Sequence, residues 1–473
     1  MTKILMVASE ARPFAKTGGL ADVIGSLPAA LHSIGENVAV LLPRYRGVEL
    51  EARRIYDHLP IWLGGVSYAT SVYQVGEAVP YFFLDCPELY DREGLYGTAR
   101  GDFPDNHIRF GLLSRAALEV SRHTFRPQVI HCHDWQSGLV SAYLRTLLAG
   151  DPTFIGVKTL FTIHNLGYQG LFPKGALPDV GLPDTLFRPD ALEFYGRVNF
   201  MKAGILYSDS LSTVSKAYAR EIQTPEYGWG LDGLLRSRSA VLTGILNGVD
   251  YSQWNPETDP YIAANYSKAD LSGKRICKHA LLHEFGFDTQ AAQDRPLIGV
   301  VTRLAGQKGA DLIAGIGEDL AKEELTLVAL GSGEAKYEKI LLDLALAHPD
   351  NIAVRIGYDD KLAHRIEAGA DMFLMPSRYE PCGLNQIYSL RYGTIPIVRA
   401  TGGLDDTIEE HTGFKFQQYS GSALLEAIRA ALTEFRRPEK WAVRMERAMS
   451  KDFSWDVSAL EYSKLYRRLV EIA

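Results

Sequence analysis

The feature that most constrains the fold of this chain is a repeated alternation of short apolar runs, glycine-containing polar loops and stretches of helical periodicity. Near the amino terminus, the apolar run 4–8 is followed by the loop 16–22 and then by apolar residues at helical spacing up to Ile34. A second apolar run, 38–42, follows. This order predicts parallel strands joined by crossover helices, which is a doubly wound α/β sheet.

The alternation stops and then restarts, which predicts two domains of the same class. The first half continues with apolar runs at 129–130, 159–163 and 210–214, and the second with runs at 297–302, 325–330, 352–356, 372–375 and 395–398. At 473 residues the chain also exceeds what one hydrophobic core usually serves. We predict domains at 1–245 and 246–454, and we expect an amphipathic helix at 455–473 to join the first domain.

Charge and cysteine usage exclude several classes of protein. The formal charge of −7, from 50 basic and 57 acidic residues, argues against a general nucleic-acid binder. No apolar run approaches the ~20 residues of a membrane span, so we expect no membrane association. The four cysteines lie far apart, which favours a reduced cytoplasmic chain over a disulfide or zinc framework.

Two loops of the first domain carry candidate ligand-binding residues. Gly18 and Gly19 let the backbone approach a ligand closely, and Lys16 beside them adds a positive charge, although a glycine-rich helix entry explains the same pattern. His164 and Asn165 follow the strand predicted at 159–163. His164 is either a core histidine or a site residue at the carboxyl end of a strand.

The segment 131–135 reads His-Cys-His-Asp-Trp and invites a metal interpretation. Alternate residues of a strand point to opposite faces, so these neighbours cannot all converge on one ion, and no second ligand cluster follows. We expect a polar site at the end of a strand instead. The loop around Tyr96 is a further polar segment, suited either to a sugar or to solvated surface.

Arg303 and Lys308 lie in one glycine-flanked loop after a strand. Like charges so close repel unless an anion lies between them, so we favour an anion site, and specifically a diphosphate site, over a hydrated loop. The Walker-type phosphate motif is absent from the sequence.

The segment 377–386 places Glu380 and Gly383 on a loop between a predicted strand and a predicted helix. Glu380 is expected to contact a polar group and the Gly383 turn an anionic one. The loop that follows the next strand, 401–406, echoes the loop 17–22.

In combination, these motifs make the chain resemble the family of bacterial glycogen synthases and starch synthases. The segments that carry the resemblance are spread over nearly the whole chain: 16–22, 161–165, 246–250, 303–309, 376–384 and 401–404.

The resemblance implies a glycosyltransferase of the GT-B type, with two facing Rossmann-like domains and a deep interdomain cleft. Such enzymes transfer glucose from ADP-glucose to the non-reducing end of an α-1,4-glucan with retention of configuration. The expected partners are ADP-glucose and a glycogen acceptor. No metal or other cofactor is expected.

The resemblance also assigns roles to single residues. It implies that His164 lies near the reacting carbon, that Arg303 and Lys308 bind the diphosphate, and that Glu380 holds glucose hydroxyls. The implied donor-binding residues are Lys16, which would reach the diphosphate from the other domain, Gly18, Gly19, Asn247, Cys382, Gly383, Leu384 and Thr401. The implied cleft or acceptor residues are Asp22, Tyr96, Asp134 and Asn165.

Two alternatives remain open from the sequence. The motifs for diphosphate and glucose do not distinguish nucleobases, so a glucosyltransferase that uses UDP-glucose is one alternative. An inactive glucan-binding protein is the other.

Overall fold

The computed structural model describes residues 1–49 and 51–471, so the last two residues of the helix predicted at 455–473 lie outside the described residues. The chain forms two compact units. The first comprises Met1–Val214, Ala219–Gly248 and the terminal segment from Trp455, and the second comprises Ser215–Tyr218 and Val249–Ser454. The break after Gly248 lies a few residues beyond the one predicted after residue 245.

The first unit is built on a nine-stranded sheet that is parallel except at one edge, where β4 and β3 run antiparallel to their neighbours. Its strands, in spatial order, are β14 (Leu242–Gly244), β13 (Ser210–Thr213), β9 (Lys158–Ile163), β8 (Val129–His133), β1 (Lys3–Val7), β2 (Asn37–Pro43), β5 (Tyr81–Asp85), β4 (Val66–Val75) and β3 (Arg53–Leu63). Two small antiparallel sheets accompany it: β10 (Leu171–Phe172), β12 (Arg197–Asn199) and β11 (Glu193–Phe194) form one, and β6 (Gly97–Thr98) and β7 (Gly101–Asp102) form the other.

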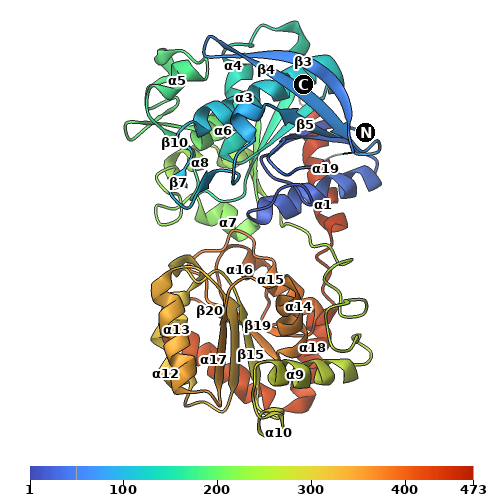
Figure 1. Cartoon of the computed structure of the whole chain (residues 1–473), viewed down its shortest axis with the longest axis vertical. Coiled ribbons are helices and arrows are strands. Elements are labelled where there is room, and N and C mark those ends of the chain that lie inside the picture. Colours follow the sequence, from blue (N-terminus) through green and yellow to red (C-terminus); the bar gives the residue numbers. More distant parts are fainter. Residues whose placement is uncertain (50, 472–473) are drawn as a thin grey trace. The chain divides into compact units, whose positions relative to one another are not determined.

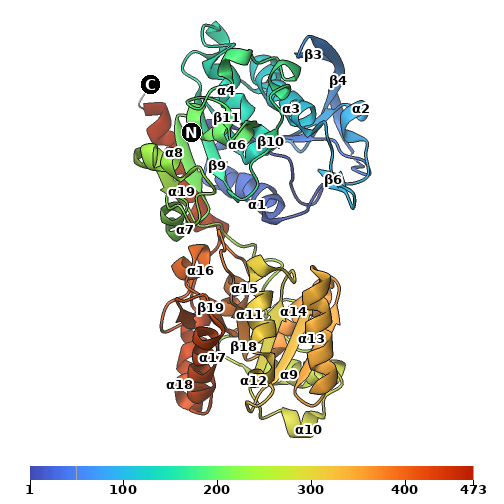
Figure 2. The same ribbon diagram turned by 90° about the vertical axis from the view of Figure 1, so that its left-hand side faces the viewer.

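Helices α1 (Gly19–Ser33) and α19 (Trp455–Glu471) lie side by side against this sheet (Figure 1, Figure 2). Apolar side chains of both helices join the core formed by β1 and β2, among them Leu27 and Leu31 from α1 and Tyr462 and Leu465 from α19. The terminal helix therefore buries its apolar face in the first unit.

The remaining helices of the first unit are shorter or lie on other parts of the sheet. They are α2 (Pro87–Tyr90), α3 (Asn106–Val120), α4 (Leu139–Arg145), α5 (Ala176–Asp179), α6 (Phe200–Tyr207), α7 (Lys216–Glu221), which spans the break at Tyr218, and α8 (Asp232–Ser237). Helix α6 begins at Phe200, because Val198 and Asn199 before it pair with β10 as part of β12. The Asn199 side chain then caps the helix by accepting a hydrogen bond from the backbone N–H of Lys202.

The second unit is a six-stranded parallel sheet. Its strands lie in the order β17 (Ile352–Ile356), β16 (Thr326–Gly331), β15 (Leu297–Val301), β18 (Met372–Met375), β19 (Ile395–Arg399) and β20 (Phe414–Phe416). Five of these strands were predicted from apolar runs, and β20 was missed because it is short and carries Lys415 at its centre.

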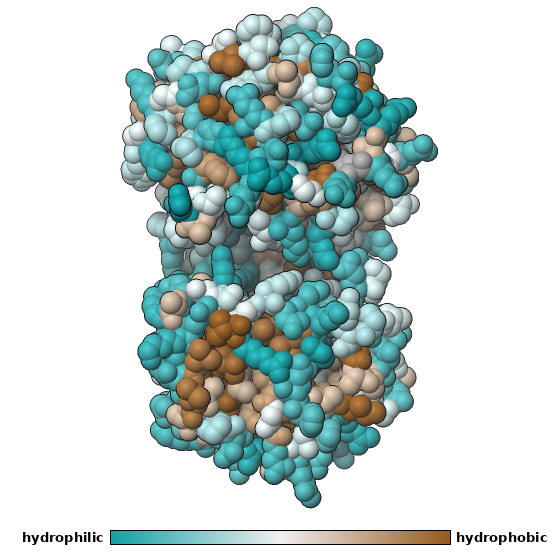
Figure 3. Space-filling view, viewed as in Figure 1, coloured by the Kyte–Doolittle hydropathy of each residue, from teal (hydrophilic) through white to brown (hydrophobic). Residues whose placement is uncertain are grey.

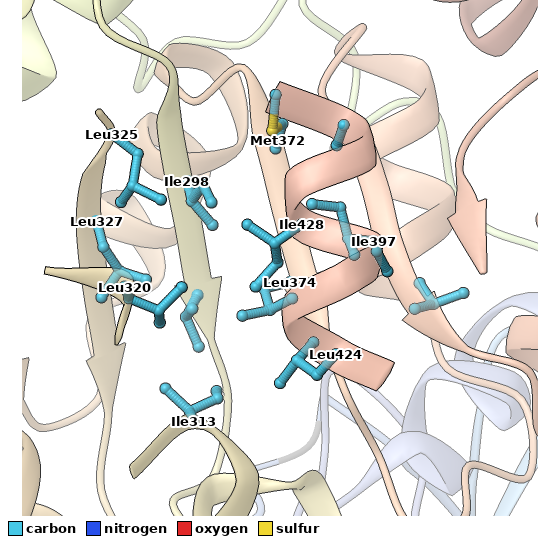
Figure 4. Close-up of a cluster of buried hydrophobic side chains, with 14 of the residues drawn as sticks. Ile298, Ile313, Leu320, Leu325, Leu327, Met372, Leu374, Ile397, Leu424 and Ile428 are labelled. Carbon is cyan, nitrogen blue, oxygen red and sulfur yellow. The ribbon is translucent and has the colours of Figure 1, made fainter. Parts of the chain in front are cut away.

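Strand residues alternate between the two faces of this sheet. Leu327 and Leu374 join one core, which also takes in Leu424 and Ile428 of α17 (Gly421–Phe435; Figure 4). Their neighbours Val328 and Phe373 join another core. The first core also packs α11 (Ala310–Gly315), α12 (Gly317–Leu320) and α13 (Ala335–Ala347), and the second packs α9 (Ser272–Glu284) and α14 (Asp360–Gly369).

The other helices of the second unit are α10 (Thr289–Ala292), α15 (Asn385–Arg391), α16 (Gly402–Thr407) and α18 (Pro438–Met449). On the face seen in Figure 3, hydrophilic residues cover much of both units, and hydrophobic residues gather on part of the second. Sheets with helices on both faces confirm the predicted α/β class with two Rossmann-like units. Among the described residues, no helix has the length and apolar character needed to cross a bilayer.

Candidate active site

Each sheet contains one point at which the chain reverses the direction in which it adds strands. In the first sheet β1 lies between β2 and β8, and in the second β15 lies between β16 and β18. Loops that leave the two strands at such a point diverge, and ligands of doubly wound sheets bind there, at the carboxyl ends of the strands. Most of the predicted site residues lie on loops at these two points.

In the first unit, the loop after β1 is organised by a carboxylate that sequence reasoning did not single out. Glu10 is buried and accepts hydrogen bonds from the backbone N–H groups of Thr17 (2.5 Å) and Gly18 (3.2 Å). Its other oxygen accepts from the hydroxyls of Thr17 (2.6 Å) and Tyr96 (2.5 Å). Glu10 thus joins the predicted residues Gly18 and Tyr96. Its position just after a strand was the only signal for it in the sequence.

Lys16 pairs with a carboxylate of the neighbouring helix α1. Its Nζ lies 2.8 Å from Oδ1 of Asp22, and Nη1 of Arg12 lies 3.2 Å from the same oxygen. Both cations are half-exposed, so solvent screens these contacts and they contribute little stability, about 0–1 kcal/mol each. Two cations that share one carboxylate in this way leave positive charge available to an anionic ligand.

Gly18 and Gly19 have open space where a side chain would begin. A Cβ atom built on either residue meets no described atom within 4 Å, and neither backbone has a positive φ. Packing and backbone geometry therefore do not require glycine at these positions. Close approach of a ligand, as expected from the sequence, is the remaining physical reason for two adjacent glycines.

The ends of β8 and β9 place Asp134 beside His164. Asp134 has a left-handed backbone (φ 56°), and its Oδ1 accepts a hydrogen bond from the backbone N–H of His164 at 2.7 Å. Burial raises the pKa of Asp134 to about 7, although the N–H groups of His164 and Asn165 oppose this shift. The carboxylate therefore titrates near neutral pH.

His164 is buried, and burial lowers its pKa to about 3, so the imidazole is neutral at physiological pH. Its Nε2 lies 3.0 Å from Nδ1 of His133. The other nitrogen of His133 is buried with no hydrogen-bond partner among the described residues. Because a buried N–H without an acceptor is costly, the proton of His133 belongs on Nδ1 and is donated to His164. His164 then carries its own proton on Nδ1, where it remains a donor.

The remaining predicted residues of the first unit lie close to these loops or to the sheet edge. Asn165 accepts a hydrogen bond from the backbone N–H of Gly167 at 3.0 Å. Asn247 follows β14 and is buried, and its side-chain oxygen has no hydrogen-bond partner within residues 1–49 and 51–471. An unsatisfied buried acceptor of this kind fits a residue that awaits a polar ligand.

In the second unit, Lys308 and Glu380 form an ion pair. Nζ of Lys308 lies 2.5 Å from Oε2 of Glu380, and the two side chains are 24% and 7% exposed. The hydroxyl of Ser377 donates to the same carboxylate oxygen at 3.1 Å. A carboxylate 72 positions along the chain therefore neutralises Lys308, and the diphosphate site expected at Arg303 and Lys308 stays a prediction.

Arg303 differs from Lys308, because its guanidinium contacts a neutral group. Nη2 of Arg303 donates to the side-chain oxygen of Gln307 at 2.8 Å, and Arg303 is exposed. The backbone oxygen of Gln307 in turn accepts from the backbone N–H of Arg378 at 2.8 Å. The loop after β15 is thereby tied to the loop after β18, and both lie at the reversal point of the sheet.

Glycines allow the loops after β18 and β19 to pack backbone against backbone. A Cβ atom on Gly402 would lie 1.9 Å from the carbonyl oxygen of Glu380, and one on Gly403 would lie 1.9 Å from that of Cys382. The backbone N–H of Gly403 donates to the carbonyl of Glu380 at 3.0 Å. Gly383 has a φ of 70°. This packing holds the turn that follows Thr401 against the backbone of Glu380 and Cys382.

The predicted site residues thus form two groups. Lys16, Gly18, Gly19, Asp22, Tyr96, Asp134, His164, Asn165 and Asn247 lie in the first unit, and Arg303, Lys308, Glu380, Cys382, Gly383, Leu384 and Thr401 lie in the second. The first group includes a neutral histidine beside a carboxylate, and the second includes a lysine paired with a carboxylate. Within the described residues, no group of three or more histidine, cysteine, aspartate or glutamate side chains is placed to hold a metal ion.

Comparison with known proteins shows similarity along the whole chain. Residues 3–237 match the family model described as the starch synthase catalytic domain, and residues 284–447 match that of glycosyl transferases group 1. A glycogen synthase of Koribacter versatilis (strain Ellin345) is 50% identical over 479 residues, which cover 99% of this chain and 98% of that relative. A glycogen synthase of Anaeromyxobacter dehalogenans (strain 2CP-C) is 48% identical, with 99% of each chain covered.

Two solved structures resemble this one. The catalytic domain of Starch Synthase IV from Arabidopsis thaliana, bound to ADP and acarbose, has a TM-score of 0.90 and 35% identity, with 99% of each chain covered. A sucrose-phosphate synthase from Thermosynechococcus elongatus has a TM-score of 0.64, 19% identity and full coverage of both chains, which shows a shared fold.

Some glycines of the site are packed tightly against backbone and others face open space, and alanine substitutions distinguish the two kinds. We predict that Gly403→Ala lowers the free energy of unfolding by about 2–3 kcal/mol, because its Cβ collides with backbone that cannot move aside. Gly18→Ala, with open space around its Cβ, should change the free energy of unfolding by no more than about 0.5 kcal/mol. Urea denaturation measures both, and equal stability of the two variants would contradict the described packing.

Proposed function

We propose that this chain, which belongs to the family of glycogen synthases and starch synthases, transfers glucose from ADP-glucose to the non-reducing 4-hydroxyl of an α-1,4-glucan with retention at the anomeric carbon. The chain is a hexosyltransferase. The starch synthase from Arabidopsis has ADP and acarbose bound, which supports a nucleotide sugar and a glucan as the two substrates. We place the protein in the cytoplasm, where its four buried free cysteines would stay reduced.

One observation carries the proposal: the cation Lys308 and the carboxylate Glu380 lie side by side at the reversal point of the second sheet. In ADP-glucose the diphosphate and the glucose ring are directly bonded. A donor site therefore needs a group for phosphate oxygens next to a group for sugar hydroxyls, and this pair supplies both.

Arg303 and Lys308 would stabilise the departing diphosphate. Breaking the bond between glucose and phosphate places negative charge on the leaving group and positive charge on the sugar ring. Cations held at the phosphate therefore bind the transition state more tightly than the ground state. Arg303 is exposed and its guanidinium donates to the neutral amide of Gln307, so it can turn toward phosphate at the cost of one neutral hydrogen bond.

Glu380 would hold glucose hydroxyls once Lys308 turns toward the diphosphate. Its oxygen Oε2 is then left with the hydroxyl of Ser377 and can accept a hydrogen bond from the sugar. A carboxylate in this role orients the donor and does not attack it. We propose that retention arises from a front-face substitution guided by the leaving phosphate, with no covalent glucosyl intermediate and no step assigned to a metal.

His164 would contribute a hydrogen bond and not act as an acid, because a histidine whose pKa is near 3 is a neutral imidazole at neutral pH and has no imidazolium proton to give up. The tautomer that His133 imposes leaves Nδ1–H of His164 available as a donor. Asp134, which titrates near neutral pH, is the neighbouring group able to accept from a sugar hydroxyl.

We predict that the protein incorporates labelled glucose from ADP-glucose into glycogen and that Lys308→Ala lowers turnover about a hundredfold, since removing one transition-state contact of this kind costs ~3 kcal/mol. The matched control is Lys339→Ala on α13, whose side chain is 75% exposed and pairs with Asp343. The control should keep the wild-type rate.

The same assay separates the alternative functions. Incorporation from UDP-glucose alone would favour the UDP-dependent alternative. Glycogen binding without incorporation from either donor would favour an inactive glucan-binding protein. A wild-type rate in the Lys308→Ala variant would contradict the proposal that Lys308 binds the diphosphate.

The pH dependence of kcat/KM provides a test of Asp134. Its pKa is raised from the ordinary 3.8 to about 7, so the group is protonated below pH 7 and ionised above it. Because the ionised form accepts hydrogen bonds, we expect kcat/KM to fall as the pH decreases through about 7. Asp134→Asn should lower the plateau and remove this decrease. A decrease that persists unchanged in Asp134→Asn would show that another group causes it.

A further inference from the structure

Two exposed aromatic residues of the first unit have a backbone conformation that glycine adopts far more readily. Tyr195 has a φ of 48° and is 83% exposed, and Trp229 has a φ of 51° and is 49% exposed. Left-handed backbone is unfavourable for bulky side chains. Each residue precedes a glycine, Gly196 or Gly230, which also has a positive φ. Strain of this kind gathers at functional sites, because the surrounding structure must maintain it.

The turns that carry the two aromatic residues are neighbours, because the backbone just after Trp229 packs on the ring of Tyr195. A Cβ atom on Gly230, which follows Trp229, would lie 3.2 Å from Cε2 of Tyr195 and 2.9 Å from Cζ of Phe194. The rings of Phe194 and Tyr195 pack edge to face, with centroids 4.7 Å apart. We refer to Tyr195 and Trp229 together as the aromatic platform. The turn that carries Trp229 leads directly into α8 (Figure 1).

The platform is attached to the loop that carries His164. Gln169, which is buried, donates from its side-chain amide to the backbone oxygen of Trp229 at 3.1 Å. Its side-chain oxygen accepts from Asn199 at 2.7 Å, so the amide is fixed in orientation. Tyr168, one residue before Gln169, is a third exposed aromatic residue of this loop.

We propose that the aromatic platform binds glucose units of the α-1,4-glucan acceptor that lie beyond the unit receiving the transferred glucose. A glucose ring offers an apolar face of C–H groups and a rim of hydroxyls, and an exposed aromatic ring covers that apolar face without needing charge. The platform lies in the same unit as His164, Asp134 and Asn165 and is joined to their loop. This assignment rests on the proposed function, because a glucan acceptor is the substrate that extends beyond the reacting centre.

Glycine substitutions are the most informative variants. Trp229→Gly and Tyr195→Gly remove a ring and also relieve the left-handed strain, so the unfolding midpoint should stay the same or rise. The matched control is Trp62→Gly, which removes a 61% exposed ring on β3 of the same unit. Trp229→Phe keeps an aromatic ring and should rescue most of the lost binding.

The experiment measures maltoheptaose affinity by calorimetry on the full chain, together with the KM for ADP-glucose. We expect each glycine variant of the platform to weaken maltoheptaose binding by about tenfold while the KM for ADP-glucose changes less than about twofold. The Trp62→Gly control should bind as the wild type does. This pattern, with the unfolding midpoint retained, supports the platform.

Three results would overturn the proposal. Wild-type maltoheptaose affinity in both glycine variants would show that the rings do not touch the glucan. An equal loss of affinity for ADP-glucose would show that the surface serves the donor or the fold. Loss of self-association in sedimentation, with glucan binding intact, would assign the surface to contact between copies of the chain. Failure of the proposed function gives a different result from failure of the aromatic platform. In that case the wild-type protein would bind maltoheptaose but incorporate no glucose.

Discussion

The contact between Lys308 and Glu380 is the interaction on which the site of the second unit depends. Glu380 is almost fully buried, and a buried carboxylate is stable only while donors such as the Lys308 ammonium and the Ser377 hydroxyl contact it. The loops after β15 and β18 must therefore stay close together. The close approach of Gly309 to the carbonyl of Pro376 secures that distance by packing backbone on backbone. Gly402, in the loop after β19, packs in the same way on the carbonyl of Glu380 and supports the loop after β18.

The two units use burial in different ways. In the second, burial favours the ion pair of Lys308 with Glu380, and we propose that the diphosphate of the donor takes the place of this carboxylate at Lys308. In the first, burial keeps His133 and His164 neutral and raises the pKa of Asp134 toward 7. Burial thus stabilises a charged pair in the second unit and neutral or weakly charged hydrogen-bonding groups in the first.

The sequence predicts features that depend on neighbouring residues well, and features that depend on contacts between distant segments of the chain poorly. The strand Met372–Met375 is predicted residue for residue, because a buried parallel strand reads as a continuous apolar run. The edge strand Ile352–Ile356 is predicted with the same bounds, although it is only partly buried and contains Arg355. The strand Phe414–Phe416 has too short a run to recognise. The partners of Lys16 and Lys308, the role of Glu10 and the tautomer of His164 depend on contacts between separate loops. The sequence identifies those residue types at strand ends and leaves their pairing to the tertiary structure.

The central claim is that Lys308 exchanges Glu380 for the terminal phosphate of the nucleotide. The most direct measurement is the affinity of the full chain for ADP and for AMP, by calorimetry, in the wild type, in Lys308→Ala and in Lys339→Ala. We predict that the preference for ADP over AMP falls by at least about tenfold in Lys308→Ala, while AMP affinity and the Lys339→Ala control stay at wild-type values. An unchanged preference for ADP in Lys308→Ala would contradict the account.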